Sequence, residues 1–147
     1  MSIKIMDNLI KSFILGGNAL FTIKSNVTGN YYTYRVRRST KKPNIYIIYL
    51  QAQQSTYCGY FSIYNKSISY YRPKEKSTFD QYSKQIIALL WTVKNSTKLS
   101  GKVDVFHEGR CACCGRKLTD PTSIERGIGP DCYRKLNQNF ILERIKK

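Results

Sequence analysis

The chain has 147 residues, enough for one domain or for one domain with a small appendage, and 41% of them are hydrophobic. It contains 25 Lys and Arg against nine Asp and Glu, a formal net charge of +16. This excess indicates a polyanionic partner, most often nucleic acid. The sequence has no apolar run of transmembrane length, no phosphate loop and no serine nucleophile motif, so we expect neither a membrane span nor an enzyme.

The first segment, residues 3–15, is predicted to form a short amphipathic helix that ends at Gly16 and Gly17. Asp7 and Lys11 interrupt its apolar residues, so it lacks the unbroken apolar stretch of a signal peptide. Four of the five cysteines cluster near the C-terminus, unlike the even, dispersed cysteines of a secreted disulfide framework. These features predict a reducing, cytoplasmic compartment.

Five short strand-like segments follow, separated by turns that contain Gly, Asn or Pro. They span residues 20–25, 31–39, 45–53, 57–65 and 67–72. This spacing predicts an antiparallel β-meander, and twelve tyrosines are typical of such half-buried surfaces.

Alternation within residues 31–38 assigns the two faces of one strand. The face predicted to join the core carries Tyr32, Tyr34 and Val36. The face predicted to meet solvent carries Tyr31, Thr33, Arg35 and Arg37.

Residues 78–95 have the strongest helical pattern, with apolar residues from Phe79 to Val93 on one stripe and Ser77 or Thr78 as a candidate N-cap. Such a stripe requires a surface to cover, which the meander supplies. Residues 102–106 are a candidate further strand. The predicted fold class is therefore α+β, a meander sheet packed by one or two helices. We expect a basic domain at 1–106 and a metal-binding module with a C-terminal helix at 107–147.

The cysteine segment has the pattern His107-x3-Cys111-x2-Cys114-x17-Cys132. Two thiolates separated by two residues can bind one ion from a tight turn, and one histidine with three cysteines is a common structural zinc set. The segment therefore predicts a zinc knuckle with these four ligands. Cys113, between the pair, is expected to point away. Without His107, a water, Asp104 or Glu108 would have to complete the coordination shell.

Capping residues predict two helical segments in the rest of this module. Asp120 can cap a helical turn that Pro121 begins and Gly127 ends. Pro130 suits the first turn of a C-terminal helix, whose N-terminal amides would stabilise the Cys132 thiolate.

Two other roles for these cysteines stay open. A thioredoxin-like redox pair would need its two cysteines in a βαβ setting, which the predicted elements do not provide. A catalytic thiol would need an orienting histidine and a third partner, and His107 is the only histidine. Unligated core cysteines are the remaining alternative, and this is the simplest role for Cys58.

The stretch HEGRC-x-x-CGRKLTDPTSIERGIGPDC, residues 107–132, resembles the C-terminal zinc-finger-like module of DUF6011, a family of small phage and prophage proteins of unassigned function. The upstream stretch FTIKSNVTGNYYTYRV also resembles a strand-turn-strand opening in that group. Cys113 departs from the pattern. The resemblance implies metal binding and a phage or prophage origin, with the host cytoplasm as location.

The candidate nucleic-acid contacts are cationic or aromatic side chains on one strand, its turn and the cysteine module. They are Tyr31, Arg35, Arg37, Arg38, Lys41, Lys42, Arg116, Lys117 and Arg126. Arginines and lysines neutralise phosphates. Tyrosines on a basic sheet, with Tyr46, Tyr60, Tyr64 and Tyr70 as candidates, can stack bases, which favours single-stranded DNA or RNA over duplex.

These observations predict a zinc-stabilised nucleic-acid-binding protein. The alternative is a phage anti-defence protein, such as an anti-CRISPR, or a host-takeover inhibitor. Such a protein would bind an acidic or nucleic-acid-binding host defence protein, because a basic chain can also dock on an acidic protein surface.

Overall fold

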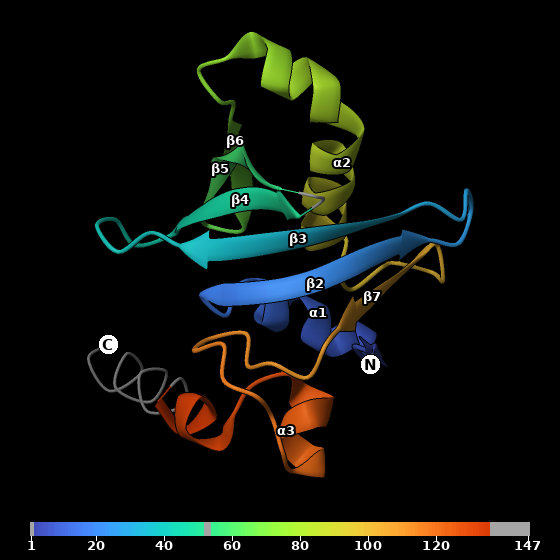
Figure 1. Cartoon of the computed structure of the whole chain (residues 1–147), viewed down its shortest axis with the longest axis vertical. Helices are drawn as coiled ribbons and strands as arrows, with labels where there is room; N and C mark the ends of the chain where they lie inside the picture. The colour runs from blue at the N-terminus through green and yellow to red at the C-terminus, as the bar shows by residue number, and fades with distance from the viewer. Residues whose placement is uncertain (1, 52–53, 136–147) are drawn as a thin grey trace.

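The computed structural model describes residues 2–51 and 54–135, and it confirms the α+β class. Its centre is a seven-stranded sheet with the order β1-β7-β2-β3-β4-β5-β6, in which every neighbouring pair is antiparallel (Figure 1). The strands are β1 Ile3–Lys4, β2 Asn18–Ser25, β3 Tyr31–Arg38, β4 Ile45–Gln51, β5 Ser55–Tyr64, β6 Ser67–Tyr71 and β7 Val103–His107. The predicted meander is β2 to β6, and β7 returns to pair with β2.

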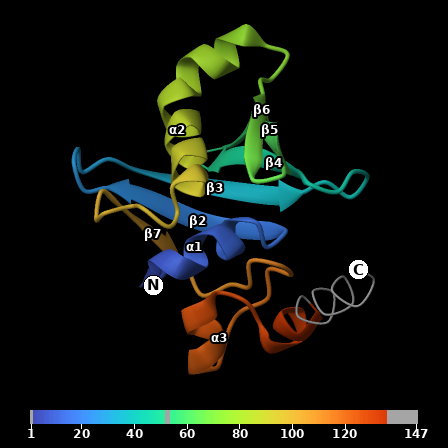
Figure 2. The ribbon, with the colours of Figure 1, turned by 180° about the vertical axis from the view of Figure 1, so that it is seen from behind.

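Two helices cover one face of the sheet. They are α1 (Asp7–Ile14) and α2 (Lys76–Lys94), and both lie behind the strands in Figure 1 and in front of them in Figure 2. The strands alternate to match, because Tyr34 and Val36 are fully buried under the helices while Tyr31 is 70% exposed. The α2 stripe buries Ile86, Leu89 and Val93, which closes the core.

The opposite side of strands β2 to β6, which we call the open face, is not covered by a helix among the described residues. Direct cross-strand pairs place side chains on the same face, so two rows can be followed across it. One row runs Arg35, Tyr49, Tyr57, and the other runs Arg37, Ile47, Tyr60, Tyr71.

The N-terminal helix begins later than predicted. Ile3 and Lys4 pair with His107 and Phe106 of β7 instead of joining a helix, so α1 starts at Asp7. At α2, the N-cap is Glu75 and its side chain makes no capping hydrogen bond, so the predicted Ser77 or Thr78 cap is wrong. Tyr82 leaves helical geometry (φ −114°, ψ 19°) and kinks α2.

Strand β5 contains a bulge that changes which tyrosines share a face. Cys58 and Gly59 are both buried, Gly59 has a φ of 92°, and the register with β4 shifts between Ile47 and Tyr49. One extra residue in a strand reverses the alternation beyond it. Tyr57 and Tyr60, three residues apart, therefore both lie on the open face. The burial of Cys58 confirms its role in the core.

Among the helices of the described residues, none combines the length and the apolar character that crossing a membrane requires.

Candidate metal centre and basic sheet face

Strand β7 leads directly into a tight hairpin, residues 109–118, that carries two of the cysteines. Its two arms are joined by backbone hydrogen bonds from Cys111 to Arg116 (2.8 Å) and from Leu118 to Gly109 (2.7 Å). At the tip, Gly115 has a φ of 79° and its amide donates to the Cys111 carbonyl. The left-handed conformation at Gly115 lets the chain turn back immediately after Cys114, as a metal-binding knuckle requires.

The described part of the module ends in two helical segments. α3 (Pro121–Arg126) begins where Asp120 accepts a hydrogen bond from the Ser123 amide (3.0 Å) and ends at Gly127 with a φ of 75°. These capping predictions are confirmed. Residues 130–135 are also helical, with Cys132 in the first turns. The remainder of the predicted C-terminal helix lies outside the described residues.

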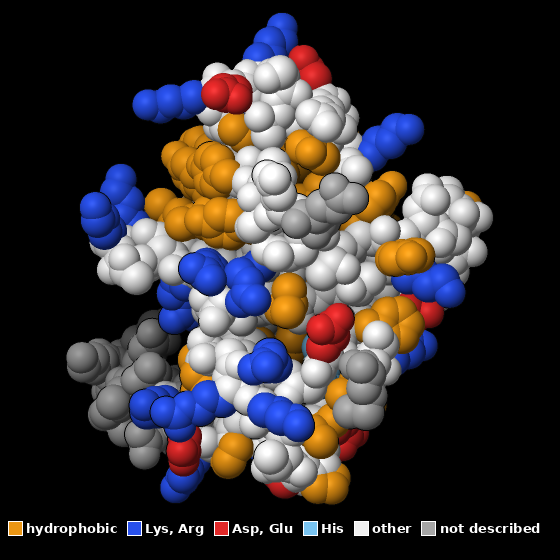
Figure 3. All heavy atoms as spheres, viewed as in Figure 1, with side chains coloured by type: hydrophobic (Ala, Val, Ile, Leu, Met, Phe, Trp, Pro, Cys, Tyr) orange, Lys and Arg blue, Asp and Glu red, His pale blue; other side chains and the backbone are white. Residues whose placement is uncertain are grey.

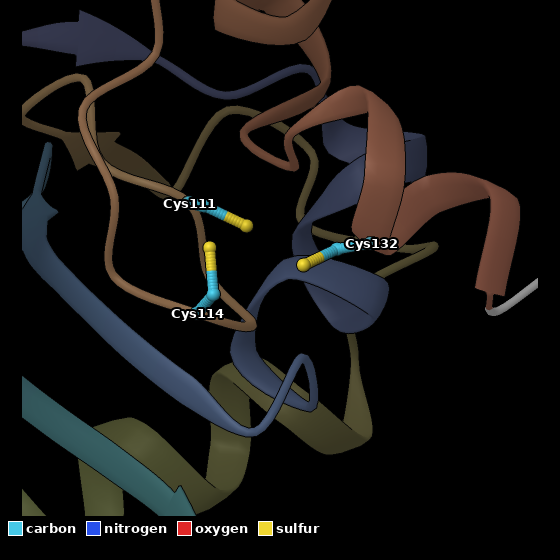
Figure 4. Close-up of side chains that lie close together, drawn as sticks. All are labelled: Cys111, Cys114 and Cys132. Carbon is cyan, nitrogen blue, oxygen red and sulfur yellow. The ribbon is translucent and has the colours of Figure 1, made fainter.

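Three thiols converge in this module. The sulfur atoms of Cys111, Cys114 and Cys132 lie within 4.8 Å of one another and point toward a common centre (Figure 4). Sulfurs that share one tetrahedral zinc stand about 3.8 Å apart, given Zn–S bonds of about 2.3 Å. The cluster therefore has the donor atoms and nearly the spacing of a metal site. A set of three cysteines takes the place of the predicted set of three cysteines and one histidine.

The surroundings of Cys111 favour its thiolate. Burial raises the pKa of this thiol, but hydrogen bonds outweigh burial and leave the pKa below its ordinary value. Its sulfur accepts hydrogen bonds from the backbone N–H groups of Gly129 (3.3 Å) and Cys113 (3.4 Å). Burial raises the pKa of Cys132 well above its ordinary value, and hydrogen bonding to the Cys113 and Cys114 thiols raises it further. Three thiols packed this closely stay partly protonated unless a cation joins them.

His107 lies outside the cluster. Its ring is 1% exposed and stacks on Phe13, with ring centroids 5.3 Å apart. The Gly109 amide donates to Nδ1 (3.0 Å), so Nε2 carries the proton and donates to the Ile124 carbonyl (2.8 Å). Burial lowers the His107 pKa, and the Ile124 hydrogen bond only partly opposes this. Because both nitrogens are engaged by backbone groups, His107 connects β7, the hairpin and α3 instead of facing the sulfurs.

The other candidates for a fourth ligand also lie elsewhere. The Asp104 carboxylate contacts the Lys4 ammonium (3.2 Å) and the Asn26 side-chain amide (3.2 Å). Glu108 is exposed beside Thr22 and Phe106 on the sheet. Cys113 is half-buried and is not among the three thiols of the cluster, although its thiol contributes to the raised pKa of Cys132.

The module packs tightly on the N-terminal part of the chain. Ala112 is fully buried, and its carbonyl oxygen accepts a hydrogen bond from the Asn18 backbone amide (2.6 Å). Ala112 lies so close to Gly16 that a Cβ added to Gly16 would stand 2.8 Å from the Ala112 Cβ. A Cβ at Gly127 would collide with the Phe13 ring. Two glycines therefore allow the approach of the hairpin to the α1–β2 junction and of α3 to α1.

Arginines of β3 and of the hairpin lie near one another. Arg35 donates to the Asn18 side chain (2.7 Å), and its pKa is lowered first by burial and then by the neighbouring Arg37 and Arg110 guanidinium groups. Arg110 belongs to the hairpin, where it donates to the Gly115 carbonyl (3.2 Å). We call Arg35, Arg37 and Arg110 the arginine group.

The structure places the other predicted contacts in separate parts of the molecule. Tyr31, Lys41 and Lys42 are exposed, Arg116 and Lys117 border a pocket of about 290 Å³ over the cysteines, and Arg38 lies 5.9 Å from the Tyr46 ring centroid. Arg126 points instead to Tyr133, with its guanidinium 3.9 Å from the ring centroid.

The tyrosines divide differently from the sequence prediction. Tyr46 is buried in the core, and Tyr70 donates its hydroxyl to the Cys58 carbonyl (2.8 Å). Tyr60 does lie on the open face, together with Tyr49, Tyr57 and Tyr71, which sequence reasoning did not single out. In Figure 3, hydrophobic side chains gather over β4 to β6 on this side, and Lys and Arg side chains lie below them.

Comparison with known proteins covers only the C-terminal part. The model of DUF6011, a family of unknown function, matches residues 103–137. These residues include β7, the hairpin, the three clustered cysteines and α3. The chain matches no curated protein and no solved structure.

Proposed function

We propose that the protein binds nucleic acid through its open face and that zinc, held by Cys111, Cys114 and Cys132, stabilises the adjoining module. The arginine group carries this proposal. Burial lowers the pKa of Arg35 most, and the Arg37 and Arg110 guanidinium groups lower it further, so an anion placed beside Arg35 would relieve the repulsion that these two groups add. A phosphate fits because guanidinium groups donate in pairs to its oxygens.

The charge distribution favours the binding of a polyanion over the binding of a single phosphate. Between Asn8 and Lys74 the chain has ten Lys and Arg and no Asp or Glu. This span includes all of β2 to β6, so the open face of these strands contains no acidic side chain. Glu108 beside Thr22 and Glu75 at the N-cap of α2 lie at the edges of this face, but a surface on which cations predominate attracts a polyanion along its length.

Zinc is the metal that the donor set supports. Thiolates select zinc over magnesium or calcium, which prefer oxygen ligands. A zinc ion with three thiolates carries a net charge of −1, and Arg116, Lys117 and Lys135 border the pocket over the sulfurs. These cations offset that charge, and the ion would place Arg110 opposite β3 by fixing the hairpin.

The proposal is tested by fluorescence polarisation with labelled single-stranded DNA and RNA between about 50 and 200 mM salt. We expect binding that weakens steeply with salt. Arg35→Ala, Arg37→Ala and Arg110→Ala should each weaken binding and reduce the magnitude of the log–log salt slope by about 0.7. Lys84→Ala removes the same charge from α2, on the helical face, and should change neither quantity by a comparable amount.

Absence of binding at low salt would overturn the proposal. A pull-down from host extract would then test the second role for a basic face, an acidic protein partner of the anti-defence kind. The phage origin implied by the DUF6011 resemblance belongs to that alternative as much as to nucleic-acid binding.

A further inference from the structure

A groove lies at the far edge of the open face, away from the cysteines. The proposed function, which was argued from charge, does not account for it. Its volume is about 930 Å³, within the roughly 300–1,000 Å³ range of small-molecule sites. The groove lies between β5, β6 and the start of α2. Its lining includes Tyr57, Tyr60, Tyr71, Arg72 and Lys74.

Aromatic rings form the floor of this groove. Tyr60 and Tyr71 are stacked, with ring centroids 4.8 Å apart and planes 19° from parallel. Tyr57 and Tyr71 remain 43% and 46% exposed although each has an aromatic neighbour. Burial and the neighbouring Tyr60 and Tyr49 raise the pKa of Tyr57, so this ring stays neutral at physiological pH. Neutral, half-exposed rings offer flat apolar surface to a second flat group.

The β5 bulge builds this floor. Without it, Tyr57 and Tyr60 would lie on opposite faces of the strand. Gly59 makes the bulge possible, because a Cβ there would collide with the Tyr71 carbonyl oxygen and stand 2.9 Å from the Tyr70 hydroxyl. The close approach of β5 and β6 at Gly59 brings the three rings together.

The charges at the rim of the groove indicate which kind of planar ligand binds on these rings. Arg72 and Lys74 contribute two positive charges against one negative charge from Glu75. Arg72 also lies 5.5 Å from the Phe79 ring centroid, which restricts its position. Along the sheet, Arg37 is separated from Tyr60 by one strand, about 10 Å at the usual strand spacing. Cations therefore stand on two sides of the rings, as a base with phosphates on either side requires.

We propose that this groove stacks the bases of a single-stranded nucleic acid whose phosphates contact the arginine group and the groove rim. The inference rests on the proposed function and adds the reason for strand selectivity. Bases in a duplex are stacked on one another and cannot reach these rings, whereas unpaired bases can. Stacking of this kind tolerates every base, so little sequence preference is expected.

The experiment compares three ligands of equal length at one salt concentration. They are a thymidine oligonucleotide, the same phosphodiester chain without bases, and a duplex. We expect the abasic chain and the duplex to bind at least roughly fivefold more weakly than the thymidine strand, the lower end of the effect of one stacked base.

Variants then assign the effect to the groove. Tyr57→Leu and Tyr60→Leu should each weaken thymidine-strand binding roughly 5- to 100-fold and leave the abasic chain unaffected. Tyr60→Phe retains the ring and should bind normally. Tyr64→Leu is a matched control, because Tyr64 is 74% exposed on β5 but lies outside the groove. Of the two groove variants, Tyr57→Leu is the less able to disturb folding because Tyr57 is the more exposed, and a thermal melt checks each protein.

The outcomes separate the two proposals. If the thymidine strand and the abasic chain bind equally well, stacking is excluded and the arginine proposal stands. If Tyr57→Leu and Tyr64→Leu behave alike, the groove is not the site. If neither single strand binds at low salt, both proposals fail.

Discussion

The body of the protein and its cysteine module are stabilised by different interactions. The body buries a contiguous apolar core, with Phe13, Phe21, Ile48, Phe61 and Leu89 at 1% exposure or less. The module, between His107 and Lys135, has only four residues in that core, Cys111, Ala112, Leu118 and Ile128. A segment this short cannot exclude enough apolar surface from water to fold independently. We infer that it depends on the thiol cluster and on contacts with α1.

We expect the largest difference between the two regions when one of the clustered thiols is removed. Cys132→Ser should reduce bound zinc from about one per chain to near zero, because two remaining thiolates hold zinc weakly. Amide hydrogen exchange should then accelerate across residues 109–135, while β2 to β5 keep their protection because their core is intact. A strong chelator should have the same effect on the unmodified protein.

Cys113→Ser is the matched control for this change. Its thiol is half-buried in the same hairpin but is not one of the three that converge. Zinc content and exchange rates should therefore stay near those of the unmodified protein. Equal loss of zinc from both variants, or full retention by Cys132→Ser, would contradict the assignment of the three ligands.

The contacts between the two regions predict the next largest effect. Gly127→Ala places a methyl group in collision with the Phe13 ring at a φ of 75°. Gly29→Ala imposes a similar conformation, φ 79°, in open space. The left-handed backbone costs about 1–2 kcal/mol in either variant, and overpacking adds about 1–3 kcal/mol at Gly127 alone. Urea unfolding of both variants measures the difference. Equal destabilisation would mean that α3 does not depend on Phe13.

Local sequence signals predicted much of this arrangement. Alternation identified the buried face of Tyr34 and Val36, because one side of an antiparallel strand must meet the core. Asp120 and Gly127 fixed the limits of α3, because caps act within one turn. Both signals operate over a few residues.

Features that depend on distant partners were not predictable in the same way. The spacing of His107 from Cys111 suits a ligand, and nothing in it indicates that the Ile124 carbonyl lies within reach of Nε2. Similarly, the pattern of β5 does not reveal the bulge at Gly59, which depends on the approach of Tyr71 in β6. The cluster of three thiols was accessible from spacing, whereas the tyrosine groove required the register of three strands.

His107 provides the finest test of how the two regions are joined. His107→Gln should retain about one zinc per chain, because the ring does not face the sulfurs. It should lower the free energy of unfolding by about 1–3 kcal/mol, because it disturbs two buried hydrogen bonds. Loss of zinc in this variant would make His107 a ligand after all.

The pH dependence of stability isolates the same side chain. The folded-state pKa of His107 is depressed below its ordinary value of 6.5, so the unfolded chain binds the proton more readily. Its contribution to stability is therefore complete above about pH 6.5 and is lost as the pH falls toward the folded-state pKa. His107→Gln cannot titrate, so the stability gap between the two proteins should narrow below pH 6.5. The measurement is the difference between the urea midpoints of the two proteins at each pH. Release of zinc in acid affects both proteins, so its effect cancels in this difference. A gap that is constant from pH 8 to pH 5 would mean that the imidazole is not held neutral by burial between β7 and α3.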